Sequence, residues 1–383
     1  MDLRVIDTLV RETRLVQKTG RCIRLRGHMP CDACRKACSH GLPLRDGGDD
    51  IVSIDALESC TSCGACVSAC PTEALALAGG ALGMWVDTLA ELAGSAASIT
   101  IACSAAGCDS PDIEALCLRS WDPAIALFAA TARNDSCTLR VVTGPCGRCT
   151  EGAGSPSVAD WVSEAQGLIG SLGLSDGISH QILGTDGDVH PTPAGLDRRR
   201  FFHALQRSGR QAIGAYARLQ GRAAQPGEWG VGQPGERRAL AVCALDRITV
   251  RPGCRTAAFT STQPGRTTTL RPVVNIESCT VCGGCALFCP TGALEAGVVD
   301  SRWVLMLDPR ACVGCGVCAK LCRADALRLE PSTLRNMLRR GERIIASIPA
   351  NNCTQCGSPA RIDGGEPLCA TCGKARERFR DFY

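Results

Sequence analysis

The chain has 383 residues, of which 28 are cysteine, and its formal net charge is +4. This length predicts two or three domains. So many cysteines indicate either a disulfide scaffold or a series of metal sites, and disulfide scaffolds are usually short secreted chains. No apolar signal-peptide core is present in the first residues, MDLRVIDTLVRETRLVQKTG, and no segment approaches 18 consecutive apolar residues. We therefore expect a cytoplasmic protein without a transmembrane helix, whose reduced thiols are available to metals.

Residues 1–80 hold two runs of four cysteines, which we expect to form the first domain. The regular run is Cys60-x2-Cys63-x2-Cys66-x3-Cys70-Pro71, and the run before it is Cys22-x8-Cys31-x2-Cys34-x3-Cys38. Three cysteines at intervals of three wrap a tight turn around one face of a 4Fe–4S cluster, and the fourth points to a neighbouring cluster. The interspersed glycines let the backbone approach the inorganic sulfides and donate hydrogen bonds to them.

Residues 84–195 alternate helical and strand patterns. We expect helices at 86–94, 121–133 and 158–170, and strands at 98–103, 138–144 and 178–183. This order predicts a small α/β domain with a parallel sheet.

Two cysteine pairs follow the first two strands of that domain, namely Cys103-x4-Cys108 and Cys146-x2-Cys149. Because parallel strands end at one edge of a sheet, the four thiols are expected to converge there. They could hold a further iron–sulfur cluster or zinc, form a redox-active pair from Cys146 and Cys149, or remain uncoordinated. The cysteines without partner spacing are expected to pack as apolar side chains: Cys117, Cys137, Cys243 and Cys254.

Residues 196–265 connect this domain to the next one. The stretch 196–240 carries nine arginines against three acidic residues. It predicts a basic helix at 198–220 and a Gly/Pro-rich linker at 225–236.

Residues 266–330 repeat the eight-cysteine arrangement. The spacing is Cys279-x2-Cys282-x2-Cys285-x3-Cys289-Pro290, followed by Cys312-x2-Cys315-x2-Cys318-x3-Cys322. Both eight-cysteine blocks resemble the two-cluster bacterial ferredoxins, which hold two 4Fe–4S clusters each, and short strands like theirs are expected near 273–277, 304–308 and 326–330. In the second block the resemblance implies one cluster on Cys279, Cys282, Cys285 and Cys322. It implies the other on Cys312, Cys315, Cys318 and Cys289. The block departs from the family at Arg323, where a proline often follows the last cysteine.

The N-terminal block departs further, because one gap has grown from two residues to eight. By analogy with the family, Cys60, Cys63 and Cys66 pair with Cys38. Likewise, Cys22, Cys31 and Cys34 pair with Cys70, and the inserted IRLRGHMP forms a loop over that cluster. In the alternative, Cys22 is no ligand, and the site holds a 3Fe–4S cluster or uses His28.

Residues 331–383 are expected to contain a short helix, at 331–340, and a metal-binding tail. The tail reads Cys353-x2-Cys356-x12-Cys369-x2-Cys372 and resembles a zinc ribbon, with a single iron or a site without metal as the alternatives. The middle domain resembles the thioredoxin-like two-iron ferredoxins, although their second cysteine pair is usually spaced Cys-x3-Cys. It is also similar to small iron–sulfur subunits of hydrogenase–heterodisulfide reductase assemblies.

The fold expected from these patterns is a multi-domain α+β chain in which two ferredoxin-like modules flank a parallel α/β domain and a zinc ribbon follows. Four 4Fe–4S clusters with their thiolates contribute roughly −8, which changes the net charge from +4 to about −4. The formal basic charge is therefore no argument for binding nucleic acid.

We expect a multi-cluster electron-transfer protein, without a catalytic site of its own, that serves as the relay subunit of a larger oxidoreductase. As the partner we expect a molybdenum or tungsten enzyme, a hydrogenase or a flavin enzyme, docked by the basic helix or the N-terminal segment. Three alternatives remain: an iron–sulfur sensor, a thiol–disulfide enzyme using Cys146 and Cys149, and a cluster carrier.

Overall fold

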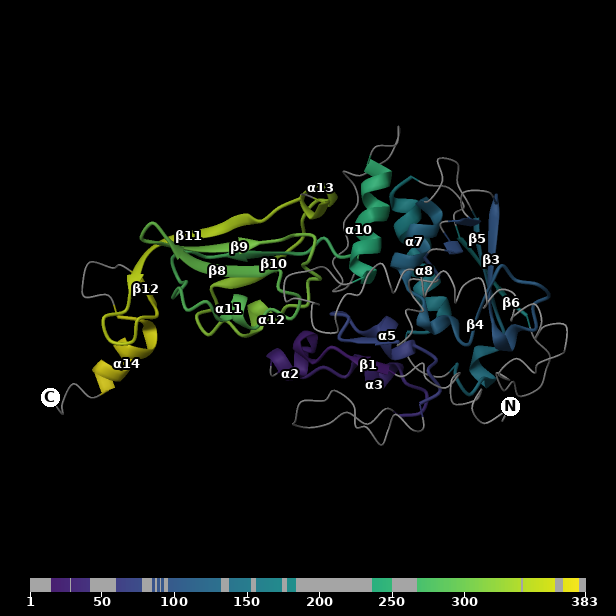
Figure 1. The fold of residues 1–383 in the computed structure, drawn as a ribbon, viewed down its shortest axis with the longest axis horizontal. Helices are drawn as coiled ribbons and strands as arrows, with labels where there is room; N and C mark the ends of the chain where they lie inside the picture. The colour runs from purple at the N-terminus through teal and green to yellow at the C-terminus, as the bar shows by residue number, and fades with distance from the viewer. Residues whose placement is uncertain are drawn as a thin grey trace, which may run out of the picture.

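The computed structural model describes most of the cysteine-bearing chain. The described residues are 15–27, 29–41, 60–77, 85–86, 88–89, 91–92, 96–131, 138–152, 156–173, 178–183, 236–249, 267–338, 340–361 and 368–378. The basic helix expected at 198–220, most of the expected linker, His28, Cys137 and Cys254 lie outside them. In Figure 1 a parallel sheet and an antiparallel sheet lie at opposite ends, with the N-terminal segment beneath and one long helix between them.

The N-terminal segment is closed by a short antiparallel ladder. Strand β1 (Leu15–Gln17) pairs with β2 (Leu75–Leu77), which brings the two ends of the cysteine-rich segment together. Between them the described residues form a 3-10 turn (Thr19–Arg21) and the five-residue helices α2 (Ile23–Gly27), α3 (Ala33–Ala37) and α5 (Ala65–Ala69). The inserted segment after Cys22 thus begins with a helix, where a loop was expected.

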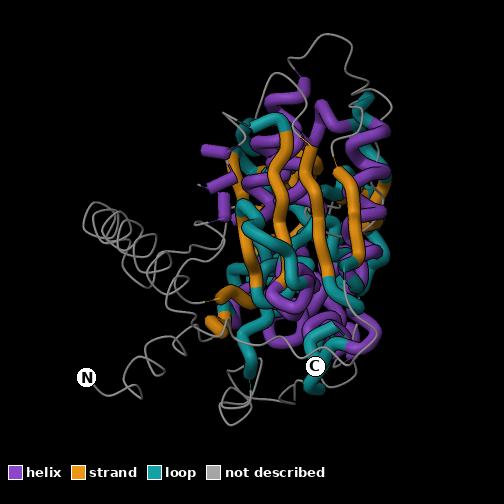
Figure 2. Tube along the Cα trace, turned by 90° about the vertical axis from the view of Figure 1, so that its right-hand side faces the viewer, coloured by secondary structure: helices purple, strands orange, loops and turns teal. Residues whose placement is uncertain are grey.

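The α/β domain has the predicted parallel sheet. Its strand order is β4-β3-β5-β6, formed by β4 (Ile113–Ala115), β3 (Ser98–Cys103), β5 (Thr138–Thr143) and β6 (Ile178–Ile182). Figure 2 looks at the molecule from the end where this sheet lies. The predicted strands at 98–103, 138–144 and 178–183 are confirmed, and the three-residue β4 is an addition that its short pattern did not indicate.

The two main helices of this domain begin at side-chain caps. Asp122 accepts hydrogen bonds from the first backbone N–H groups of α7 (Pro123–Thr131). Ser157 and Asp160 form a reciprocal capping box at the start of α8 (Val158–Ser171). Both helices were predicted, as was the helix near 86–94, whose described residues are helical.

Helix α10 (Glu236–Thr249) joins the two ends of the molecule. Its buried residues Val242, Ala244 and Leu245 share one apolar core with α7 and with α13 (Leu334–Leu338). Arg247 lies over the Phe128 ring at 4.8 Å. The helix begins where a linker was expected to end, so the core of the α/β domain draws on sequence far beyond residue 195.

The described residues of the C-terminal module form two antiparallel sheets. Strand β7 (Arg271–Val274) pairs with β10 (Leu327–Glu330). The second sheet has the order β12-β11-β9-β8, with β8 (Leu294–Val299), β9 (Arg302–Leu307), β11 (Arg343–Asn352) and β12 (Pro359–Arg361). Helices α11 (Gly284–Leu287), α12 (Val317–Lys320) and α14 (Ala370–Arg378) complete it. Because β11 pairs with β9, this sheet crosses the boundary expected at residue 330. None of the described helices is long and apolar enough to cross a membrane.

Candidate metal centres

The structure gathers sixteen of the cysteines into four sets, which we name by module. Sets N1 and N2 lie in the N-terminal segment and sets C1 and C2 in the C-terminal module. Set N1 is Cys22, Cys31, Cys34 and Cys70, and set N2 is Cys38, Cys60, Cys63 and Cys66. Set C1 is Cys279, Cys282, Cys285 and Cys322, and set C2 is Cys289, Cys312, Cys315 and Cys318. These are the groupings that the ferredoxin resemblance implies.

Set N1 lines a pocket under helix α2, and all four of its cysteines contribute to the lining. Burial and the neighbouring Cys70 and Cys31 thiolates raise the pKa of Cys34 to about 12. The backbone N–H of Ala74 donates to the Cys70 sulfur at 3.2 Å. Cys22, whose role was open because of the eight-residue gap, is 7% exposed and lies in this pocket with the others.

Set N2 is partly buried, and its Cys66 side chain is 8% exposed. Burial, followed by the charges of Cys63, Cys60, Cys34 and Cys38, raises the pKa of Cys66 well above its ordinary value. Burial also raises the pKa of Cys63 to about 11, and the carboxylate of Glu151 contributes to the same shift. Since Cys34 belongs to set N1, its influence on Cys66 places the two sets side by side.

Sets C1 and C2 adjoin one another in the same way. Burial and the thiolates of Cys282 and Cys279 raise the pKa of Cys285 to about 12. Burial raises the pKa of Cys318 well above its ordinary value, with contributions from its own set and from Cys285 of set C1. The Ala326 N–H donates to the Cys322 sulfur at 3.3 Å, the counterpart of the Ala74 contact in the first module.

The regular cysteine triplets share one backbone conformation. A residue with positive φ stands between the first two cysteines of each triplet: Ser62 (+59°), Val281 (+51°) and Gly314 (+63°). A second stands before the short helix that carries the third cysteine: Gly64 (+75°), Gly283 (+70°) and Gly316 (+77°). Left-handed residues at these points turn successive N–H groups toward one side of the loop, as an anionic cluster requires.

These four sets fit iron–sulfur clusters on their own chemistry. The three regular triplets repeat one turn, N–H groups point at ligand sulfurs, and burial raises the thiol pKa values, so the thiolates need a cationic partner. A bound 4Fe–4S cluster would supply that charge and a one-electron redox couple.

The tail forms a separate, smaller site. The sulfur atoms of Cys353, Cys356, Cys369 and Cys372 all lie within 4.8 Å of one another, and the Cys356 and Cys369 sulfurs are 3.6 Å apart. Thiolates bound tetrahedrally to one zinc at about 2.3 Å lie about 3.8 Å apart. Backbone N–H groups, first that of Cys369, lower the pKa of Cys353 to about 6. The site therefore fits a single ion, either zinc or iron.

The middle cysteines are only partly arranged as expected. Cys103, Cys146 and Cys149 lie together, since Cys103 and Cys149 both raise the pKa of Cys146 after burial. The Cys108 thiol instead contacts the carbonyl of its neighbour Asp109, at 4.0 Å. The spacing of the cysteines did not indicate Cys117 as a ligand. Burial raises the pKa of Cys117 to about 12, and the thiolates of Cys63 and Cys103 contribute to this shift.

An apolar seam joins the two ferredoxin-like modules. Its buried members are Ile23, Met29 and Val317, and the partly buried Cys31, Cys315, Phe288 and Leu321 pack against them. The Arg26 guanidinium donates to the Leu287 carbonyl across the same boundary, at 2.9 Å. The seam therefore contains one cysteine of set N1 and one of set C2.

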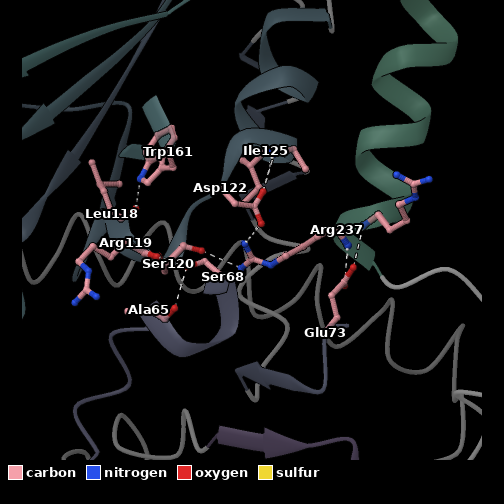
Figure 3. Close-up of polar contacts among 12 residues, drawn as sticks. Ala65, Ser68, Glu73, Leu118, Arg119, Ser120, Asp122, Ile125, Trp161 and Arg237 are labelled. Atoms are coloured by element: carbon pink, nitrogen blue, oxygen red, sulfur yellow. Dashed lines mark hydrogen bonds and ion pairs between the residues drawn. The ribbon is translucent and has the colours of Figure 1, made fainter. Parts of the chain in front are cut away.

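Buried arginines fix the remaining boundaries. The Glu73 carboxylate accepts the first N–H groups of α10, from Arg237 at 3.0 Å and Arg238 at 2.9 Å (Figure 3). The Arg237 guanidinium pairs with Asp122 at 2.7 Å and donates to the Ser120 carbonyl at 2.9 Å. Sequence reasoning missed these residues because their partners are more than a hundred positions away.

Comparison with known families matches both cysteine-rich segments, and the N-terminal match begins after Cys22. A family described as the 4Fe-4S dicluster domain matches residues 29–75. One described as the 4Fe-4S binding domain matches residues 272–295 and 305–328. No curated protein matches the chain. The chain therefore carries two 4Fe–4S ferredoxin-type domains, one near each end of its sequence.

Proposed function

We propose that this chain is a continuous electron relay with four 4Fe–4S clusters, arranged in the order C1, C2, N1, N2. The observation that carries the proposal is the seam, because Cys315 of set C2 and Cys31 of set N1 both pack against its buried apolar side chains. Each cluster, when bound, exchanges one electron at a time. A duplicated module without such a seam would amount to two unconnected ferredoxins.

The side chains of the seam would keep water out of the gap between the modules. Val317 is 1% exposed, and Ile23 and Met29 are below 10%. A dry, close-packed gap holds the two sets at a fixed separation and keeps the reorganisation of solvent small. By contrast with the seam, set C1 is open to solvent, because Cys282 is exposed and the nearby Leu287 side chain is 65% exposed. We assign set C1 as the end that meets an external redox partner.

The relay is tested by electron paramagnetic resonance of the fully reduced chain under anaerobic conditions. The variant C31S/C34S removes set N1, and the control C60S/C63S removes set N2 while leaving the seam intact. We expect the spin–spin broadening of the C-terminal clusters to decrease in the first variant and to persist in the control. A wild-type spectrum equal to the sum of the separate modules would overturn the relay.

We further propose that the chain serves the catalytic subunit of a larger oxidoreductase of the molybdenum, tungsten, hydrogenase or flavin type. The exposed apolar side chains around set C1, Ile276 and Leu287, support a protein surface there. Anaerobic purification of the tagged chain from its native host should yield a stoichiometric subunit containing one of these cofactors. Purification as a single chain with its full iron content would contradict this assignment.

For the tail we propose a structural zinc site. All four positions around a tetrahedral ion are taken by thiolates, so no ligand position is left open for catalysis. Elemental analysis should give one zinc per chain, and a rubredoxin-like absorption spectrum in place of zinc would assign a single iron.

A further inference from the structure

Three neighbouring parallel strands of the α/β domain end in cysteines. Cys103 is the last residue of β3, and Cys117 comes two residues after the end of β4. Cys146 and Cys149 follow the end of β5. The strand order β4-β3-β5 makes these three ends adjacent. The carboxyl ends of adjacent parallel strands form the edge at which ligand sites of α/β sheets are built.

Hydrogen bonds draw the three strand-end loops together. The Ser104 hydroxyl donates to the Leu116 carbonyl at 3.1 Å, which ties the β3 end to the β4 end. The Gly144 N–H donates to the Cys103 sulfur at 3.4 Å, which ties the β5 end to β3. The Cys117 thiol contacts the Glu151 carbonyl at 3.8 Å, which closes the remaining side.

Two glycines allow this close approach. A Cβ at Gly144 would lie 2.5 Å from the Ala105 carbonyl oxygen, and one at Gly152 would lie 2.0 Å from the Cys146 carbonyl oxygen. Neither position accepts a side chain without moving backbone, so the loop of residues 144–152 is folded tightly around Cys146 and Cys149. Such close backbone packing is what iron–sulfur ligand loops need.

Cys108 lies on the segment that leaves this edge. Gly107 turns the chain with φ of +59°, and by Asp112 the backbone is hydrogen-bonded to Thr100, near the start of β3. The segment of residues 107–112 therefore runs back toward the amino end of the sheet. The Cys108 thiol is turned to the carbonyl of its own neighbour Asp109.

We propose that Cys103, Cys117, Cys146 and Cys149 hold a fifth iron–sulfur cluster, with Cys117 in the ligand place that sequence spacing gave to Cys108. The mutual influence of these thiols on their pKa values supports the grouping. Cys63 of set N2 also acts on Cys117, so the new site adjoins the relay at its N2 end. Its role as the terminal cluster of the relay rests on the proposed function. The existence of the site does not depend on that function.

The test is anaerobic reconstitution of the full chain, followed by iron, sulfide and zinc analysis. The wild type should contain about 18 or 20 irons, for a 2Fe–2S or a 4Fe–4S fifth cluster added to about 16. C117S should lose the additional two or four irons and their Mössbauer signal. C108S should retain them, as should the control C243S, whose cysteine lies in α10.

Retention of the fifth cluster in C117S, or its loss in C108S alone, would overturn the ligand assignment. A wild-type count of about 16 irons, or a second zinc ion per chain, would overturn the proposal of a fifth cluster. If C117S falls below 16 irons through misfolding, C117D decides the matter. A ligating Asp keeps the iron and changes the spectrum of the fifth cluster, whereas an unchanged spectrum rules position 117 out. Loss of spin coupling across the seam would refute the relay without altering these iron counts.

Discussion

At the scale of single residues, buried arginines hold the segments around the N-terminal clusters together. Arg119 is 1% exposed and donates to three carbonyls, those of Ala37 at 2.5 Å, Glu151 at 3.1 Å and Pro156 at 3.1 Å. The Ser68 hydroxyl donates in turn to the Arg119 carbonyl. A guanidinium suits this place because its fixed fork serves several acceptors at once.

Replacing Arg119 by Met should loosen this junction. The change leaves buried carbonyls without donors, at a cost of about 1–3 kcal/mol. Hydrogen exchange in residues 33–38 and 149–152 should accelerate by about 5- to 150-fold. The control is R35M, because Arg35 forms a surface pair with Asp32 and should leave exchange unchanged. Equal protection in R119M and wild type would refute this role.

His180 should make the edge strand β6 sensitive to acid. Burial lowers the pKa of His180 below 6.5, and its Nε2 lies 3.0 Å from the Thr143 hydroxyl. The unfolded strand then binds a proton more tightly, so stability present above pH 6.5 is lost as the pH falls through the folded pKa. In H180N, protection of the β6 amides should no longer depend on pH in that range. A wild-type imidazole titrating at or above 6.5 by NMR would contradict the argument.

At this same scale the sequence predicted the regular ligand sets and missed Cys117. Ligands within one loop have fixed spacing, as in Cys60-x2-Cys63, and that spacing can be recognised directly. Cys117 and Cys103 come from different strands, and their proximity depends on the pairing of β3 with β4. A three-residue strand such as β4 carries too short a pattern to predict that pairing.

At the scale of elements, strongly patterned segments were predictable and context-dependent ones were not. Strands β3 and β5 and helix α8 have clear apolar periodicity and were predicted almost to the residue. Strand β11 was not, because its sequence RIIASIPANN alternates weakly, contains a proline and is completed by pairing with β9 and β12.

The tail elements β12 and α14 should depend on a metal bound by the four tail cysteines, whereas strands β8 and β9 should not. Arg361 in β12 donates to the carbonyls of Ile276 at 2.6 Å, Glu277 at 3.0 Å and Cys279 at 3.3 Å. The variant C356S should lose the single ion and lose exchange protection in β12, in α14 and in residues 276–279. Strands β8 and β9 should keep their protection, and the iron content should stay constant.

The matched control for the tail site is Q355S, which changes a neighbouring side chain in the same turn that is no candidate ligand. It should keep both the metal and the protection. Full protection of β12 in metal-free C356S would mean that pairing with β11 alone orders this strand.

At the scale of the whole molecule, α10 is the element through which all three parts meet. Its Arg238 is 1% exposed and donates to the Arg310 carbonyl at 3.0 Å and to those of Thr268 and Pro309 at 3.1 Å. The Glu73 carboxylate of the N-terminal segment accepts hydrogen bonds from the backbone N–H groups of the first turn of α10. Burial lowers the pKa of Arg238 to about 10, which still leaves it charged at neutral pH.

Replacing Arg238 by Met should therefore separate the modules without emptying their metal sites. Three buried carbonyls lose their donor, so the C-terminal module should be held at least about 2 kcal/mol less tightly. The radius of gyration in small-angle X-ray scattering should increase, and the spin coupling across the seam should weaken at constant iron content. The control R247M alters the contact with Phe128 at 4.8 Å and leaves the Glu73 and Arg238 contacts in place. If R238M keeps full spin coupling, the seam alone aligns the clusters, and α10 serves only the α/β core.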